Sequence, residues 1–146
     1  MNQELKSRIN IIIKDIHELV STCYPKHKFS ITYLTIFSQS DEDFSNLRKN
    51  LLEFGIEEQS NNGYKYRLNT PFKELNEEIN LVRIRKPDIH RKEFGCTDLS
   101  YNEDDYMNLR SLALDQGLDI ILRKGYEMIE LSDFNINVYA YLIKDI

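Results

Sequence analysis

The first apolar pattern along the chain predicts an amphipathic helix over residues 4–23. Apolar side chains recur there every three or four positions, which places them on one helical face. They are Leu5, Ile9, Ile12, Ile13, Ile16, Leu19, Val20 and Cys23. Pro25 then ends the helix, because proline cannot continue the backbone hydrogen bonding. Ile11 falls outside the stripe, so the helix could contact a second subunit, although we favour packing on its own domain.

A strand and a delimited helix follow. Residues 29–37 are rich in β-branched and aromatic side chains, which predicts a strand. Ser40 is a good N-cap residue, and Asp43 completes a capping-box pattern with Asp in place of the usual Glu. The buried stripe of this helix is expected to be Phe44, Leu47, Leu51 and Phe54. Gly55 is expected to end the helix in the left-handed conformation.

Three short strands are predicted after this helix. Residues 56–59 and 64–68 predict a hairpin. Its expected turn is Asn61, Asn62 and Gly63. A third strand over residues 79–85 ends before Pro87, since proline cannot donate to the strand ladder.

A shift of 62 residues superimposes this unit on the second half of the chain. The aligned pairs are Ser40 and Asn102, Asp43 and Asp105, Phe44 and Tyr106, Leu47 and Leu109, Leu51 and Ala113, Gly55 and Gly117, Gly63 and Gly125, and Tyr64 and Tyr126. The remaining strands are predicted at 96–101, 118–122, 126–131 and 138–143. Agreement of cap, stripe, stop and turn at one offset indicates an internal repeat.

These elements predict an α+β fold with two tandem β-α-β-β-β units and a separate N-terminal helix. The helix takes residues 1–25, the first unit 26–88, and a linker with the second unit 89–146, all in one compact domain. Over residues 29–146 this order resembles the vicinal oxygen chelate superfamily, which includes glyoxalases, extradiol dioxygenases and bleomycin-resistance proteins. The resemblance implies a curved mixed sheet around a shared cleft, with any metal ligands on the first and last strands of each unit.

The positions of those metal ligands hold unusual residues in this chain. Thr32 and Tyr33 stand where a His would be expected, Arg83 lies near the usual Glu position, and the last strand offers tyrosines. Only Asp98 is a plausible ligand. A divalent cation needs several N or O donors and no adjacent fixed positive charge, so we expect no metal cofactor. The alternative is an unconventional divalent-metal site formed by Asp98, Glu130 and His90.

Composition and charge narrow the expected partners. The 146 residues carry a formal net charge of −5, which disfavours nucleic acid and anionic membranes as partners. No apolar run approaches the roughly 20 residues of a bilayer span, and no signal-type core follows Met1, so we expect a soluble cytoplasmic protein. Cys23 and Cys96 are the only cysteines and lack CxxC spacing, which favours two buried free thiols.

A cationic segment within this acidic chain is the leading candidate for a binding site. From position 83 to 92 it carries five fixed cations and one acid. Side chains alternate across a strand, so Arg83 and Arg85 share one face, opposite Val82 and Ile84. If the apolar pair packs under the helices, the arginines point into the cleft, where their planar forks suit carboxylate or phosphate. The alternative is a solvated edge followed by a charged linker.

Residues of the second unit complete the candidate site. Asp98 lies in a strand that otherwise looks buried, where it could bridge to Arg83, the alternative that we favour, or act as a general base. Glu127 lies on the apolar face of its strand and is a weaker acid–base candidate with raised proton affinity, unless its strand end is open to water. Tyr139 and Tyr141 share a face and could stack on a planar ligand or simply pack in the core.

Our leading hypothesis is a metal-free small-molecule-binding protein of the glyoxalase and bleomycin-resistance type. It would bind a small organic anion in the cleft between the units, with Arg83 and Arg85 as a clamp. The first alternative is a metal-dependent lyase, isomerase or dioxygenase of the same superfamily. The second is a non-catalytic interaction protein that forms a homodimer through its N-terminal helix. Whether the protein is an enzyme stays open. No phosphate-loop or nucleophile-elbow motif is present, so the sequence gives no support to nucleotide phosphate loops or α/β-hydrolase chemistry.

Overall fold

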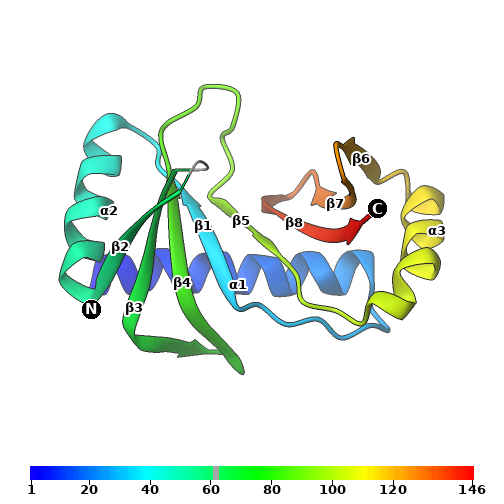
Figure 1. Ribbon diagram of the computed structural model, residues 1–146, viewed down its shortest axis with the longest axis horizontal. Coiled ribbons are helices and arrows are strands. Elements are labelled where there is room, and N and C mark those ends of the chain that lie inside the picture. Colours follow the sequence, from blue (N-terminus) through cyan, green and yellow to red (C-terminus); the bar gives the residue numbers. More distant parts are fainter. Residues whose placement is uncertain (61–62) are drawn as a thin grey trace.

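The computed structural model, which describes residues 1–60 and 63–146, is an α+β molecule built on a mixed sheet of eight strands (Figure 1). Helix α1 spans Gln3–Cys23. The first unit contains β1 (Tyr33–Phe37), α2 (Asp41–Phe54), β2 (Gly55–Ser60), β3 (Gly63–Glu74) and β4 (Glu77–Arg85). The second contains β5 (Gly95–Asp98), the short helix η1 (Glu103–Asp105), α3 (Tyr106–Gln116), β6 (Asp119–Arg123), β7 (Tyr126–Asp133) and β8 (Ile136–Asp145). The predicted pair of β-α-β-β-β units is therefore confirmed.

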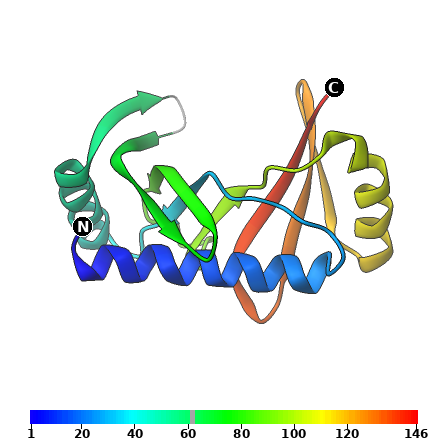
Figure 2. The same cartoon turned by 90° about the horizontal axis from the view of Figure 1, so that it is seen from below.

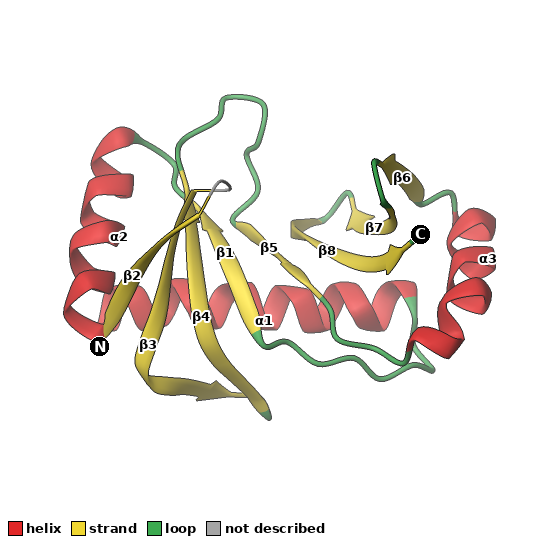
Figure 3. Ribbon diagram, viewed as in Figure 1, coloured by secondary structure: helices red, strands yellow, loops and turns green. Residues whose placement is uncertain are grey.

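The strand order reflects the repeat. It runs β2-β3-β4-β1-β5-β8-β7-β6, so the two units meet at their first strands. The first and last strands of each unit are parallel, whereas β1 and β5 pair antiparallel. Helices α2 and α3 lie at opposite ends of the molecule (Figure 3). The sheet is curved and does not close, with β2 and β6 as its edges.

Helix α1 packs along one face of the sheet, beneath both units (Figure 2). Asn2 caps it by accepting a hydrogen bond from the Leu5 amide at 2.8 Å. Seven of the eight predicted stripe residues are buried, and Val20 is partly buried, whereas Ile11 is 44 % exposed. The apolar face of α1 is therefore covered by its own chain. No helix among the described residues is both long enough and apolar enough to span a membrane.

Gly95 is required where α1 crosses the junction between the units. A Cβ atom there would lie 2.3 Å from the Thr35 carbonyl oxygen and 2.9 Å from Cδ1 of Ile12. Both distances are far below van der Waals contact, so a side chain would force β1, β5 or α1 apart. The missing side chain thus allows close packing of the two units on one helix.

The two repeat helices begin and end differently. Ser40 caps α2 by accepting from the Asp43 amide at 3.0 Å, as predicted, but the Asp43 carboxylate accepts from the Gln39 amide at 2.8 Å. The predicted left-handed end at Gly55 is wrong: its φ is −158°, and β2 starts there, so that a Cβ would lie 2.6 Å from the Arg67 carbonyl oxygen. Gly117, in contrast, does end α3 in the left-handed conformation, with φ 79°.

The first predicted hairpin is confirmed by the antiparallel pairing of β2 with β3. Its predicted turn residues Asn61 and Asn62 lie outside the described residues, and Gly63 begins β3 with φ 107°. The strand predicted at 29–37 is shorter than expected. Only Tyr33–Phe37 forms β1, while Ser30 makes an isolated bridge with Ser100.

Candidate functional site

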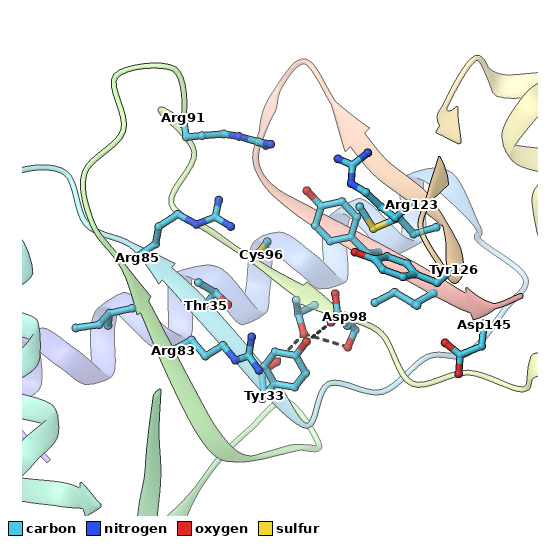
Figure 4. Close-up of a pocket in the computed structure, with 15 residues that line it drawn as sticks. Tyr33, Thr35, Arg83, Arg85, Arg91, Cys96, Asp98, Arg123, Tyr126 and Asp145 are labelled. Atoms are coloured by element: carbon cyan, nitrogen blue, oxygen red, sulfur yellow. Dashed lines mark hydrogen bonds between the residues drawn. The ribbon is translucent and has the colours of Figure 1, made fainter. Parts of the chain in front are cut away.

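A cavity of about 780 Å³ lies between the two units, on the face of the sheet opposite α1 (Figure 4). The alternation of strand side chains produces this arrangement. Leu34 and Ile36 of β1 are fully buried in the core, whereas Tyr33 and Thr35 of the same strand line the cavity. Strands of both units contribute to the wall, so the cavity is an inter-unit cleft of the kind that the resemblance implied.

Four arginines line this cleft. Arg83 and Arg85 come from β4, Arg91 from the loop between β4 and β5, and Arg123 from the end of β6. The predicted facing of the first two is confirmed, because both line the cleft, whereas the neighbouring Val82 and Ile84 are buried in the core.

Three of these guanidinium groups stack on aromatic rings. Each lies over one ring at a distance that favours a cation–π interaction. The pairs are Arg83 over Tyr33 at 5.3 Å, Arg85 over Phe37 at 4.7 Å, and Arg91 over Tyr139 at 5.5 Å. Such stacking orients the guanidinium groups so that their N–H donors point outward in the ring plane. Arg91 also interacts with the Tyr141 hydroxyl.

The cleft arginines differ from every other arginine of the chain in their ion pairing. The chain has eight arginines, and the four outside the cleft each pair with a carboxylate. The pairs are Arg8 with Asp43, Arg48 with Glu57, Arg67 with Glu58 and Arg110 with Glu127, at N–O distances of 2.8–2.9 Å. Among the described residues, no carboxylate forms an ion pair with a cleft arginine. Nε of Arg83 is buried and has no hydrogen-bond partner among the residues that the structure describes.

Asp98 does not form the predicted bridge to Arg83. Its Oδ2 atom instead accepts a short hydrogen bond from the Tyr33 hydroxyl, drawn as a dashed line in Figure 4. Burial raises the pKa of the Asp98 carboxyl, although the Tyr33 donor and the Arg83 charge oppose this shift. Burial and the nearby carboxylate also raise the pKa of Tyr33 well above its usual range. The cleft therefore contains an acid that holds its proton more firmly than a free Asp does.

Both cysteines are free thiols, as predicted. Cys23, the last residue of α1, is buried as predicted, whereas Cys96 is only half-buried and lines the wall of the cleft. Burial raises the pKa of the Cys96 thiol to about 11, although the Arg85 charge opposes this. The thiol is therefore protonated at neutral pH and is a poor nucleophile.

Glu127 lies outside the cleft, and its predicted raised proton affinity is wrong. Its carboxylate accepts from the Tyr106 hydroxyl at 2.6 Å and from Nε of Arg110 at 2.9 Å, and both contacts lower its pKa. The first unit contains the same combination of side chains in Arg48, Glu57 and Tyr66. Each group fastens a repeat helix to its strands, which is a structural role.

The other predicted site residues are placed as follows. Tyr141 lines the cleft, and its hydroxyl donates to Glu130 at 3.0 Å. Tyr139 lies just beyond this wall under Arg91, and its hydroxyl donates to Glu93 at 2.8 Å. His90 is exposed on the loop between β4 and β5.

The candidate metal ligands do not converge. Asp98 and Glu130 each accept a tyrosine hydroxyl, and His90 is not part of the cleft wall. The described part of the chain contains no group of three or more His, Cys, Asp or Glu side chains placed to hold a metal ion. The donor set of the cleft, dominated by arginine, also does not suit a divalent cation.

Sequence reasoning missed part of the cleft. Arg123, Tyr126, Met128 and Asp145 line it from β6, β7 and β8. Arg123 was missed because the predicted strand ended at residue 122, one position early. The position of Arg123 just before the turn at Gly125, at the end of a predicted strand, was the one feature of the sequence that could have indicated a cleft residue.

Comparison with known proteins supports the fold and leaves the function open. No protein-family model matches the chain, and no curated protein matches its sequence. The solved structure described as "Structural Genomics, Protein EC4020" superimposes with a TM-score of 0.64 at 15% identity, over 96% of this chain and 88% of that one. This likeness shows a shared fold alone.

A second solved structure is the fosfomycin resistance protein FosX from Mesorhizobium loti, a member of the vicinal oxygen chelate superfamily. It aligns over 79% of this chain and 90% of its own length, with a TM-score of 0.28 and 10% identity, values too low to support an argument. The paired β-α-β-β-β units are those that the superfamily resemblance implies, and membership itself stays a prediction.

Proposed function

We propose that the protein binds a small organic anion in the cleft between its two units, without a metal, and that Arg83 and Arg85 are principal contacts. The observation that supports this proposal is the difference in ion pairing. All four arginines outside the cleft pair with a carboxylate, whereas among the described residues the four in the cleft have no such partner.

A bound anion would supply the missing counter-charge. The guanidinium group donates in a planar fork that matches a carboxylate or phosphate, and such charge-assisted hydrogen bonds are stronger than neutral ones. The net charge of −5 makes the surface as a whole unfavourable for anions. Cations concentrated in one cavity therefore indicate a local binding site.

The test is a thermal-shift screen of small carboxylates and phosphates, followed by calorimetric affinities for Arg83→Gln and Arg67→Gln. Losing one charge-assisted contact costs about 1.5–3 kcal/mol, so Arg83→Gln should weaken binding about tenfold to a hundredfold. Arg67→Gln removes the same charge at an exposed ion pair outside the cleft wall, and it should leave the affinity unchanged. The proposal fails if no anion shifts the melting temperature, or if both substitutions weaken binding equally.

The two alternatives have less support in the structure. For a metal-dependent lyase, isomerase or dioxygenase, the candidate donors Asp98, Glu130 and His90 would have to converge, and the first two accept tyrosine hydroxyls instead. For a homodimer through α1, the second side of the helix at Ile11 would have to contact a partner; Ile11 is 44 % exposed, while the apolar stripe packs on its own sheet. Both stay untested predictions.

A further inference from the structure

We infer that the ligand of this cleft carries two separated anionic groups on a planar or apolar body. This inference rests on the proposed function and specifies the class of anion. It follows from three features of the cleft: where the arginines stand, how their charge is balanced, and what lines the space between them.

The arginines approach the cavity from two sides. Arg83 and Arg85 come from β4 of the first unit, whereas Arg123 comes from β6 of the second unit and lies across the cavity from them (Figure 4). An anion held by the β4 pair leaves Arg123 without an anionic partner among the described residues. A second anionic group on the same ligand would reach it.

The cleft has an excess of positive charge on both of its sides. Four arginines line it with two carboxylates, those of Asp98 and Asp145, and the carboxylate of Glu130 offsets part of the Arg91 charge. Among the described residues, Arg83 and Arg85 on one side and Arg123 on the other form no ion pair. A ligand with an anionic group at each end would supply a counter-charge to both sides.

The volume of the cavity and the side chains that line it indicate what part of the ligand would lie between its two anionic groups. A cavity of about 780 Å³ is far larger than the roughly 30 Å³ that a water molecule occupies and falls in the range of metabolite sites. Tyr126, Met128 and Tyr141 also line it, with Tyr126 on the side of Arg123 (Figure 4). Within the described chain, the rings of Tyr126 and Tyr141 stack on no aromatic or guanidinium group, so their faces are available to a planar ligand.

The test compares a matched monoanion and dianion, benzoate and terephthalate, by titration calorimetry at fixed ionic strength. Terephthalate should bind the native protein at least tenfold more tightly. Arg123→Gln should reduce terephthalate affinity to the level of benzoate and leave benzoate unchanged, whereas Arg83→Gln should weaken both. Arg67→Gln is the control for loss of a positive charge outside the cleft.

The outcomes separate this inference from the proposed function. Equal affinity for the two compounds, or a terephthalate advantage that survives Arg123→Gln, would overturn the two-group ligand and leave anion binding in place. Binding of neither these compounds nor any small carboxylate or phosphate would overturn both proposals. Arg123 is exposed, and its side chain donates to the carbonyl of the adjacent Leu122 at 3.2 Å, so its substitution should not affect folding; circular dichroism checks this.

Discussion

The protonation of Asp98 connects burial in the cleft to the stability of the whole chain. Because burial raises the pKa of this carboxyl, the native state holds the proton more tightly than the unfolded chain does. The free energy of unfolding therefore falls as pH rises from the ordinary Asp pKa of about 4 through the raised native pKa, and the loss persists above it. Asn carries no such penalty and can still accept from Tyr33.

We accordingly expect Asp98→Asn to be as stable as the native protein or more stable at neutral pH, with the difference shrinking as pH falls to about 4. Urea unfolding at both pH values measures this. Asp145→Asn is the matched control, because Asp145 also faces the cleft but is exposed. An Asp98→Asn protein that is clearly less stable at neutral pH would instead indicate a stabilising ion pair.

At the residue scale, the alternation of side chains along a strand predicted which face a residue occupies, but the sequence did not predict its hydrogen-bond or ion-pair partners. The shared face of Arg83 and Arg85 follows from strand periodicity alone, and the structure has it. The face of the strand on which Glu127 lies was also predicted correctly. Its expected apolar environment was wrong, because the side chains of Tyr106 and Arg110 reach it from α3. Contacts supplied by another element depend on packing that a local pattern does not contain.

At the scale of elements, α1 is the piece that joins the two units. Its adjacent residues Ile11 and Ile12 provide a natural comparison, since they are 44 % and 1 % exposed and Ile12 packs against Gly95. Truncation of a buried isoleucine leaves a cavity and costs about 2–5 kcal/mol, whereas surface substitutions are usually within about 0.5 kcal/mol.

We therefore expect Ile12→Ala to lower the free energy of unfolding by about 2–5 kcal/mol and Ile11→Ala to change it by less than about 0.5 kcal/mol. Urea titrations followed by circular dichroism give both values. Comparable losses at the two positions would show that α1 also buries its Ile11 side, for example against a second subunit, and would revive the dimer hypothesis.

The order of helices and strands was predictable because helix caps, apolar stripes and turn residues act locally. The residue-by-residue alignment of the two units was not predictable. The offset of 62 aligns Gly55 with Gly117, although Gly55 starts β2 directly and Gly117 is a separate residue between α3 and β6. The alignment then fails in the strands. Tyr64 packs on Phe44 of α2, whereas Tyr126 lines the cleft. A slip of one residue exchanges the two faces of a strand, so small differences in linker length decide which side chains form the site.

At the scale of the whole molecule, the two units share one sheet and one supporting helix. The units are joined by the short antiparallel pairing of β1 with β5, where Thr35 pairs with Cys96 and Ile36 with Gly95. Helix α1 contacts strands of both units across this junction. Neither unit can cover its α1-facing side alone, because the same helix supplies the cover for both.

Shared burial of this kind predicts that the two units unfold as one. We expect a single cooperative transition in urea, with coincident midpoints for far-ultraviolet circular dichroism and for the fluorescence of the nine tyrosines, and with no populated intermediate. Separate midpoints would mean that one unit persists after α1 has left the sheet. The cleft would then lie between two independently stable bodies, and ligand binding would stabilise only the step that separates them. Coincident midpoints that rise together on adding a bound anion would instead show that the cleft is formed only in the fully folded chain.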